Sequence, residues 1–255
     1  MNQNQDYQNK VEQRALEFVR NNLAVQDCFG LSDVDIKNLI ALLNKMKANT
    51  NSNKFPDFVF KDSFIEHFEV TSSLENRKGS NQKRQSKILK ENSQKDFLKQ
   101  MNGNNLNNLI MSSYNREFEE HSHKYITASF KKNWKTHIKS FEKADSLYKT
   151  GIFLIEYKDT VLETAFVRKN ELTQIFDTYR ITGDKFLLEW IYSHREKIDY
   201  LIFTNPVVAS IEVIKINKIP NIIKKFPEAI HLPTVGIEIH KFVGFKTEKK
   251  YNDET

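Results

Sequence analysis

The chain has 255 residues, 39% of them hydrophobic, so it can bury either one large core or two smaller ones. Its formal net charge of +6 allows an anionic partner such as a nucleic acid but does not require one. Cys28 is the only cysteine, which excludes an internal disulfide and a cysteine-rich zinc site. With no apolar signal segment and no apolar run of membrane-spanning length, the sequence predicts a cytoplasmic protein without a membrane partner.

The first part of the chain reads as two helices followed by two strands. Apolar residues recur every three or four positions over residues 6–25, which predicts a helix. Ser32 is a candidate N-cap for a second helix. Residues 58–60 and 64–71 then read as short strands joined in a tight hairpin, within the sequence KFPDFVFKDSFIEHFEVTSS.

A polar and strongly basic segment follows, from Leu74 to about Asn108. Two interpretations stay open: a solvated helix and loop, or a flexible arm that contacts phosphates. The candidate nucleic-acid contacts in this segment are Arg77, Lys78, Lys83, Arg84 and Lys87.

The second half of the chain predicts a mixture of helices and strands. Residues 124–149 predict a long helix with one apolar face and one basic face, ended by Gly151. The basic face includes Lys131, Lys132, Lys135 and Lys139. Residues 152–157 predict a buried strand, with 160–167 as a candidate partner, then helices at 170–180 and 184–197 and a strand at 200–205. This order predicts a mixed α/β fold with a mixed central sheet flanked by helices.

Carboxylates interrupt the apolar strands of the predicted hairpin. Side chains alternate between the faces of a strand, so His67 and Glu69 share one face and Glu66 lies on the other. The hairpin would bring Asp57 beside the face of Glu69. Two carboxylates there could share a divalent cation through their oxygen atoms. The alternative is a hairpin at a sheet edge whose acidic side chains face water.

The segments PDF and FIEHFEVT resemble the PD-(D/E)xK nuclease superfamily, which has the restriction-endonuclease-like fold. The resemblance implies that Asp57 and Glu69 hold magnesium, with Glu66 as the alternative ligand. The family's lysine position falls on Thr71 or, in the alternative alignment, on Phe68. A displaced lysine is similar to the pattern of cap-snatching endonucleases of segmented RNA viruses. Lys78 and Lys135 are then the two candidates for the catalytic lysine.

The sequence also contains a second candidate site and several histidines that could take part in chemistry. Glu156 and Lys158 form a literal Glu-x-Lys pair, with Asp145 at a family-like distance, but we interpret Glu156 as a solvent-facing strand end. His67 is either a ligand or base, or a histidine satisfied by neighbouring hydrogen bonds. His121, His123 and His137 are expected to be solvent-exposed.

The resemblance implies a Mg²⁺-dependent endonuclease, with Mn²⁺ as a substitute ion, that cuts DNA or alternatively RNA in a restriction or antiviral defence system. It also makes a homodimer an option. The expected domains are a nuclease-like core over residues 1–170, with a basic insertion near 74–115, and an extension at 171–255 packed on the same domain. The alternatives are a non-catalytic nucleic-acid-binding or interaction module with a degenerate nuclease fold, and a partner-binding toxin or antitoxin.

Overall fold

The computed structural model describes residues 3–49, 55–73, 80–102, 109–117, 121–143, 148–160, 162–168, 171–195, 198–233 and 237–245. The chain divides into two compact units, Met1–Leu74 with His121–Thr234, and Glu75–Glu120 with Val235–Thr255. This division differs from the expected one at the C-terminus. Residues 235–255 group with the inserted segment, because strand β12 (Ile237–Phe245) pairs with strand β5 (Leu109–Glu117).

A seven-stranded mixed sheet forms the centre of the first unit, in the order β1-β10-β9-β6-β4-β3-β2. Its strands are β1 (Cys28–Phe29), β2 (Lys47–Ala48), β3 (Phe58–Phe60), β4 (Ser63–Val70), β6 (Thr150–Tyr157), β9 (Ile198–Asn205) and β10 (Ser210–Lys215). β4, β6 and β9 are parallel neighbours, whereas β3 joins β4 as the predicted antiparallel hairpin. The predicted mixed α/β class and mixed central sheet are confirmed.

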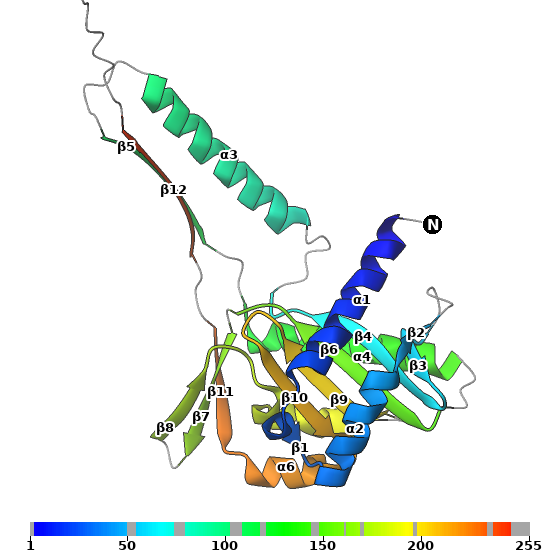
Figure 1. Ribbon diagram of the computed structural model, residues 1–255. Coiled ribbons are helices and arrows are strands. Elements are labelled where there is room, and N and C mark those ends of the chain that lie inside the picture. The colour runs from blue at the N-terminus through cyan, green and yellow to red at the C-terminus, as the bar shows by residue number, and fades with distance from the viewer. Residues whose placement is uncertain are drawn as a thin grey trace, which may run out of the picture. The chain divides into compact units, whose positions relative to one another are not determined.

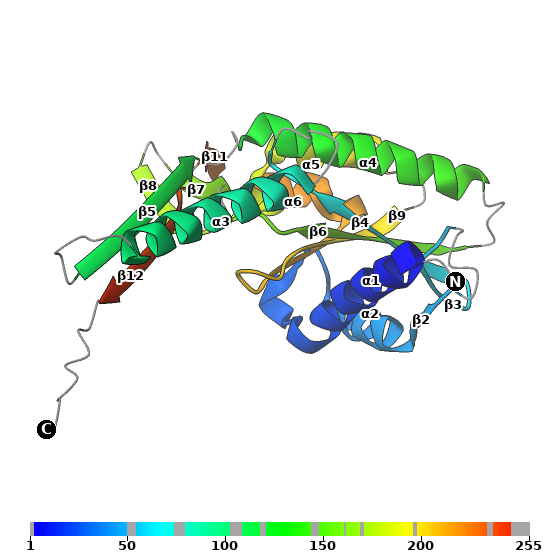
Figure 2. The ribbon, with the colours of Figure 1, turned by 90° about the horizontal axis from the view of Figure 1, so that it is seen from above.

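Helices cover both faces of this sheet. α1 (Gln3–Asn22) and α2 (Asp33–Lys45) lie on one face, and α4 (His123–Lys143), α5 (Lys185–Ser193) and α6 (Ile219–Lys225) lie on the other (Figures 1 and 2). Two buried clusters correspond to these faces. The α1-side core includes Ile65, Leu154 and Ile202, and the α4-side core includes Phe64, Phe153 and Trp134. Both faces of the central strands are therefore buried, which explains their nearly continuous apolar sequences.

Local sequence signals account for helices α2 and α4. Ser32 caps α2 as predicted: its Oγ accepts the N–H of Asp35 at 3.2 Å, and the Asp35 carboxylate accepts the N–H of Ser32 at 3.0 Å. In α4, buried Ile126, Phe130 and Trp134 recur at four-residue spacing and face the sheet. The same helix was predicted to reach residue 149 and to stop at Gly151. Gly151 instead belongs to β6, where its N–H donates to the Asp199 carboxylate at 3.0 Å.

A separate three-stranded sheet, in the order β11-β7-β8, corrects two further predictions. β7 (Leu162–Arg168) was expected to pair with β6, but β6 already has β4 and β9 on its two edges. β7 pairs instead with β8 (Glu171–Phe176) and β11 (Glu228–Pro233). The helix predicted over residues 170–180 is wrong, because residues 171–176 form the strand that returns antiparallel to β7.

The second unit contains α3 (Ser80–Asn102), β5 and β12. The basic segment is therefore helical over residues 80–102, which agrees with the interpretation as a helix rather than a flexible arm. Its strands β5 and β12 pair antiparallel over their full described length. The Cβ that a side chain would add at Gly244 of β12 would lie 2.5 Å from the Phe97 ring of α3, so the helix packs closely on this hairpin.

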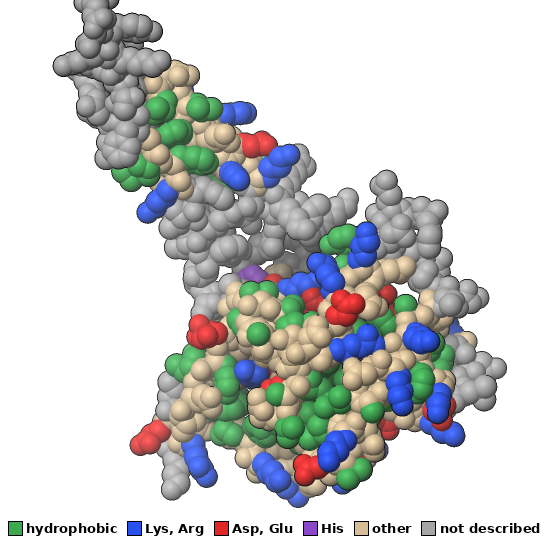
Figure 3. Space-filling model, viewed as in Figure 1, with side chains coloured by type: hydrophobic (Ala, Val, Ile, Leu, Met, Phe, Trp, Pro, Cys, Tyr) green, Lys and Arg blue, Asp and Glu red, His purple; other side chains and the backbone are tan. Residues whose placement is uncertain are grey.

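Two surface properties bear on possible partners. On one face of the first unit, Lys and Arg side chains are interspersed with acidic and apolar ones (Figure 3). Net charge alone therefore does not mark a binding face there. Among the described residues, none of the helices has both the length and the apolar composition to cross a membrane.

Candidate functional site

Asp57 and Glu66 lie side by side at the start of the β3–β4 hairpin. The N–H of Asp57 donates to Glu66 Oε2 at 3.2 Å, and Asp57 Oδ2 accepts the N–H of His67 at 2.7 Å. Burial, followed by the negative charge of Glu66, raises the pKa of Asp57 to about 8, against the hydrogen bond from His67. Ionisation of both the Asp57 and the Glu66 carboxylate is therefore unfavourable at this position.

Glu66 points to the α4 side of the sheet, where it meets His137. His137 Nδ1 lies 2.6 Å from Glu66 Oε1, and Glu66 is only 6% exposed. The prediction that His137 faces solvent is wrong, since its ring also stacks on Phe68 at a centroid distance of 4.7 Å. The edge-hairpin interpretation is also wrong for Glu66, because β4 lies inside the sheet between β3 and β6.

His67 points to the opposite, α1 side of the sheet and is 3% exposed. Its Nε2 lies 3.5 Å from Glu156 Oε2, which is longer than an N–H···O hydrogen bond. Both ring nitrogens are buried, and neither has a hydrogen-bond partner among the described residues. The interpretation of His67 as a histidine satisfied by its neighbours is therefore wrong. A buried polar atom without a partner is uncommon.

Lys158 joins two glutamates at the carboxyl ends of β4 and β6. Its Nζ lies 2.8 Å from Glu156 Oε1 and 2.5 Å from Glu69 Oε1. Burial alone would raise the pKa of Glu156, but His67 and Lys158 together lower it, so this carboxylate stays ionised. Glu156 is 5% exposed, which corrects its interpretation as a solvent-facing strand end.

α1 adds a further carboxylate that was not among the predicted site residues. Burial raises the pKa of Glu12. The charge of Glu66 also raises this pKa, whereas that of His67 lowers it. The same helix covers a pocket of about 300 Å³, which is lined by Val11, Arg14, Ala15, Phe18, Glu156, Lys158 and Pro206. Glu12 lies beside the apolar residue Val11 in α1, and this position at the border of a buried face was the only signal for it in the sequence.

These contacts link most of the predicted acidic residues into one cluster. Asp57, Glu66 and His67 are in direct contact, and Glu69 joins through Lys158 and Glu156. The specific pairing of Asp57 with Glu69 is replaced by Asp57 with Glu66. We refer to Glu12, Asp57, Glu66, His67, Glu156 and Lys158 as the hairpin cluster.

The lysines predicted to serve this site lie elsewhere or outside the described residues. Lys135 is exposed, and its Nζ lies 5.9 Å from the Trp190 ring centroid. Because Lys135 and His137 are two residues apart on α4, they point in different directions, and it is His137 that reaches Glu66. Lys78, Arg77 and Asp145 lie outside the described residues.

The other predicted nucleic-acid contacts lie on two helices. On α4, Lys132 and Lys139 are exposed, and Lys131 Nζ lies 5.4 Å from the Trp190 ring centroid. On α3, Lys87 is exposed and lies 3.8 Å from Glu91, whereas for Lys83 and Arg84 only the helical backbone is described.

Both histidines of the HSH sequence contact buried polar side chains. His121 is 8% exposed, and its Nδ1 lies 2.7 Å from Ser72 Oγ. His123 Nε2 lies 2.5 Å from Asp184 Oδ2. Burial alone would raise the pKa of Asp184, but hydrogen bonds led by that from His123 lower it. The prediction of solvent exposure is therefore wrong for His121, whereas the His123 side chain is 36% exposed.

Comparison with protein-family models, with curated proteins and with solved structures finds no match. The fold and the hairpin cluster therefore define the chain only as a mixed α/β protein with two neighbouring carboxylates, Asp57 and Glu66, and a partly buried lysine–glutamate network. Asp57 and Glu66 offer carboxylate oxygens, the ligands that Mg²⁺ and Mn²⁺ prefer. The raised pKa of Asp57 also fits a site that takes up a cation.

Proposed function

We propose that this chain is a divalent-metal-dependent nuclease that hydrolyses phosphodiester bonds, in DNA or alternatively in RNA. The single observation that carries the proposal is the contact between Asp57 and Glu66, with the pKa of Asp57 raised to about 8 by burial and by Glu66. A cation between these carboxylates offsets both the cost of burying the Asp57 charge and its repulsion from Glu66, the two causes that raise this pKa. The predicted Pro-Asp and strand-glutamate pattern supports the same site.

Asp57 and Glu66 would hold the ion. Bound Mg²⁺ or Mn²⁺ supplies a more acidic water and stabilises negative charge that builds on the phosphate. His137 orients Glu66 through its 2.6 Å contact with Oε1. This arrangement favours Glu66 over Glu69 as the ligand, because the Glu69 carboxylate is paired with Lys158.

Lys158 is our candidate for the displaced lysine. It lies at the end of β6, next to Glu156, and lines the 300 Å³ pocket together with Arg14 of α1. An ammonium group and a guanidinium group in one pocket suit a phosphate of the substrate backbone. The role of Lys158 would be to hold that phosphate and to orient the attacking water.

The fold supports the proposal at a coarse level. In chain order, with other elements between them, the first unit contains the helix α1, the antiparallel β3–β4 hairpin, the helix α4 and the strand β6, which pairs parallel to β4. We propose further that the chain has the restriction-endonuclease-like fold and acts in the cytoplasm in restriction or antiviral defence. The proposal allows, but does not require, a homodimer.

The test is cleavage of plasmid DNA, and of single-stranded DNA and RNA, in Mg²⁺, Mn²⁺ or EDTA. We expect cleavage with either ion, none in EDTA, and a loss of at least about 10²-fold in D57N and E66Q. Asp62 provides a matched control on the same hairpin, since its carboxylate is 45% exposed and pairs with Lys149. D62N should keep wild-type activity. Wild-type protein that cleaves none of these substrates, or D57N with full activity, contradicts the proposal.

One observation favours the alternative of a non-catalytic nucleic-acid-binding module. In the alignment that selects Glu66, the family's lysine position is Phe68, which is 5% exposed and stacked on His137. If Lys158 does not replace that lysine, binding without cleavage is expected. Nucleic-acid binding that persists in EDTA, with no cleavage in Mg²⁺ or Mn²⁺, would identify the module.

A further inference from the structure

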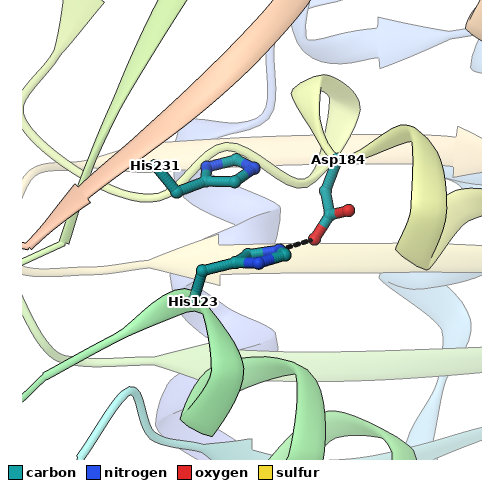
Figure 4. Close-up of side chains that lie close together, drawn as sticks. All are labelled: His123, Asp184 and His231. Carbon is teal, nitrogen blue, oxygen red and sulfur yellow. Dashed lines mark hydrogen bonds and ion pairs between the residues drawn. The ribbon is translucent and has the colours of Figure 1, made fainter.

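A second group of polar side chains lies in the first unit, apart from the hairpin cluster. His123 begins α4, Asp184 precedes α5 as its N-cap, and His231 lies on β11. One ligand atom from each residue lies within 4.8 Å of those of the other two. Figure 4 shows the two imidazole rings, one above the other, both extending toward the Asp184 carboxylate. Their centroids are 4.5 Å apart and their planes 14° from parallel.

The surroundings hold these side chains in fixed orientations. Asp184 is 2% exposed; its Oδ1 accepts the N–H of Leu187 at 2.9 Å, and its Oδ2 accepts the Tyr179 hydroxyl at 2.6 Å. His231 Nδ1 lies 3.2 Å from Thr164 Oγ1. If Nδ1 donates to this oxygen, the lone pair of Nε2 is available to an ion. Partners of this kind are typical around metal-ligating histidines and carboxylates.

The group opens onto a cavity. His123, Asp184 and His231 line a pocket of about 630 Å³ together with Lys185, Phe186 and Glu189. Phe186 is 82% exposed at this pocket. Three protein ligands leave at least one coordination position of a four-coordinate ion for water or for a ligand that enters the pocket.

We propose that His123, Asp184 and His231 bind a divalent transition-metal ion. Two imidazoles and one carboxylate suit Zn²⁺, Co²⁺ or Ni²⁺ rather than Mg²⁺, which prefers an all-oxygen shell. Zn–ligand bonds of about 2.0–2.2 Å place neighbouring ligand atoms roughly 3.3 Å apart, so side-chain shifts of about 1 Å bring the three groups into coordination. Binding of the ion replaces the hydrogen bond between His123 Nε2 and Asp184 Oδ2.

The two histidines of the proposed metal site lie close to points where the chain passes between the two units. His123 follows soon after residue 120, and His231 shortly precedes residue 235, two of the three points where the chain passes between the units. An ion bound to both histidines fixes the separation of these two segments within the first unit. Binding should therefore raise the thermal stability of the first unit as well as provide an open coordination position.

The test is titration of the full chain with Zn²⁺ and with Co²⁺, in the presence of 5-fold excess Mg²⁺ to occupy oxygen-ligand sites. We expect one ion per chain, visible Co²⁺ absorption bands of a four- or five-coordinate site, and a rise in Tm with Zn²⁺. H123A and H231A should each weaken Zn²⁺ binding by at least about 10²-fold. D184N keeps an N-cap for α5 and should weaken binding as well.

Two controls separate this site from other sources of binding. His194 at the end of α5 contacts Ser193 and the Trp190 carbonyl, so H194A removes one histidine outside the group and should bind Zn²⁺ as the wild type does. D57N should also keep Zn²⁺ binding, which makes the result independent of the proposed nuclease function. Wild-type protein that fails to bind Zn²⁺ and Co²⁺ overturns the inference. So does stoichiometric binding that survives in folded H123A and H231A, with folding checked by circular dichroism.

Discussion

Asp57 and Glu66 contact each other across the β3–β4 hairpin, where the N–H of Asp57 donates to the Glu66 carboxylate at 3.2 Å. The hairpin fixes this contact, because the register pairs Phe58 with Ile65 and so brings the preceding residue, Asp57, opposite Glu66. Two carboxylates held in this way repel each other unless a proton or a cation lies between them. The stability of the metal-free protein should therefore depend on pH through Asp57.

D57N should stabilise the metal-free protein at high pH. The folded-state pKa of Asp57, about 8, lies above the ordinary value of 3.8, so between these values the folded state keeps a proton that the unfolded state has lost. The free energy of unfolding then falls as pH rises through this window. In EDTA at pH 8 we expect D57N to exceed the wild type by at least about 1 kcal/mol, or about 2–4 °C in Tm. The advantage should shrink toward pH 4.

The control for this measurement is D62N, which should show no such dependence because its carboxylate is half-exposed and paired with Lys149. Added Mn²⁺ should raise the Tm of the wild type and leave that of D57N unchanged. A difference between D57N and the wild type that stays constant from pH 4 to pH 8 would show that Asp57 titrates normally.

Lys158 should matter for catalysis and Lys135 should not. K158M is expected to lower kcat by about 10²-fold with a small effect on KM, since it removes a charge that acts on the phosphate in the transition state. K158R should recover part of the activity because it keeps the charge. Lys135, which lies over Trp190, is the matched control. Equal activity of K158M and K135M would remove Lys158 from the mechanism.

His137 should act as a positioning residue for Glu66. H137A removes the partner of Glu66 Oε1 and should raise the Mg²⁺ concentration for half-maximal cleavage by about 10-fold or more. H137Q, which can still donate a hydrogen bond, should recover part of this loss. S140A, a change one turn along α4, serves as the control. If H137A lowers stability but leaves the Mg²⁺ dependence unchanged, the role of His137 is structural only.

The fold was predictable where local patterns act directly on the backbone. The apolar spacing of α4, the Ser32 cap of α2 and the strands β3, β4 and β6 were predicted at nearly their observed positions. The pairing of β7 was not predictable, because the partner of a strand depends on which strand edges are left unpaired by the rest of the sheet. β8 was predicted as a helix, because six residues are too few to distinguish the periodicity of a helix from that of a strand.

The candidate site was predictable only in part. Alternation along β4 places Glu66 and His67 on opposite faces, but it does not reveal that Asp57, the residue just before β3, contacts both of them. Lys158 and Glu69 are far apart in sequence and meet only because β4 and β6 are parallel and in register. Likewise, His123, Asp184 and His231 come together through tertiary packing alone.

If α4 binds the substrate backbone, its exposed lysines should determine part of the salt dependence of binding. Removing Lys132 and Lys139 together should reduce the slope of log K against log salt by up to about 1.8, or about 0.9 for each phosphate that is no longer neutralised. The control is the removal of Lys224 and Lys225 from α6, which changes net charge equally. Fluorescence anisotropy with a labelled oligonucleotide measures both slopes, and equal slopes would exclude a specific role for α4.

Anomalous diffraction from a crystal of the full chain soaked in Mn²⁺ tests the proposed metal site most directly. We expect a manganese peak bound by carboxylate oxygens of Asp57 and Glu66, absent from D57N crystals soaked in the same way. A wild-type crystal with these two carboxylates well ordered and no manganese between them at saturating Mn²⁺ would contradict the proposal.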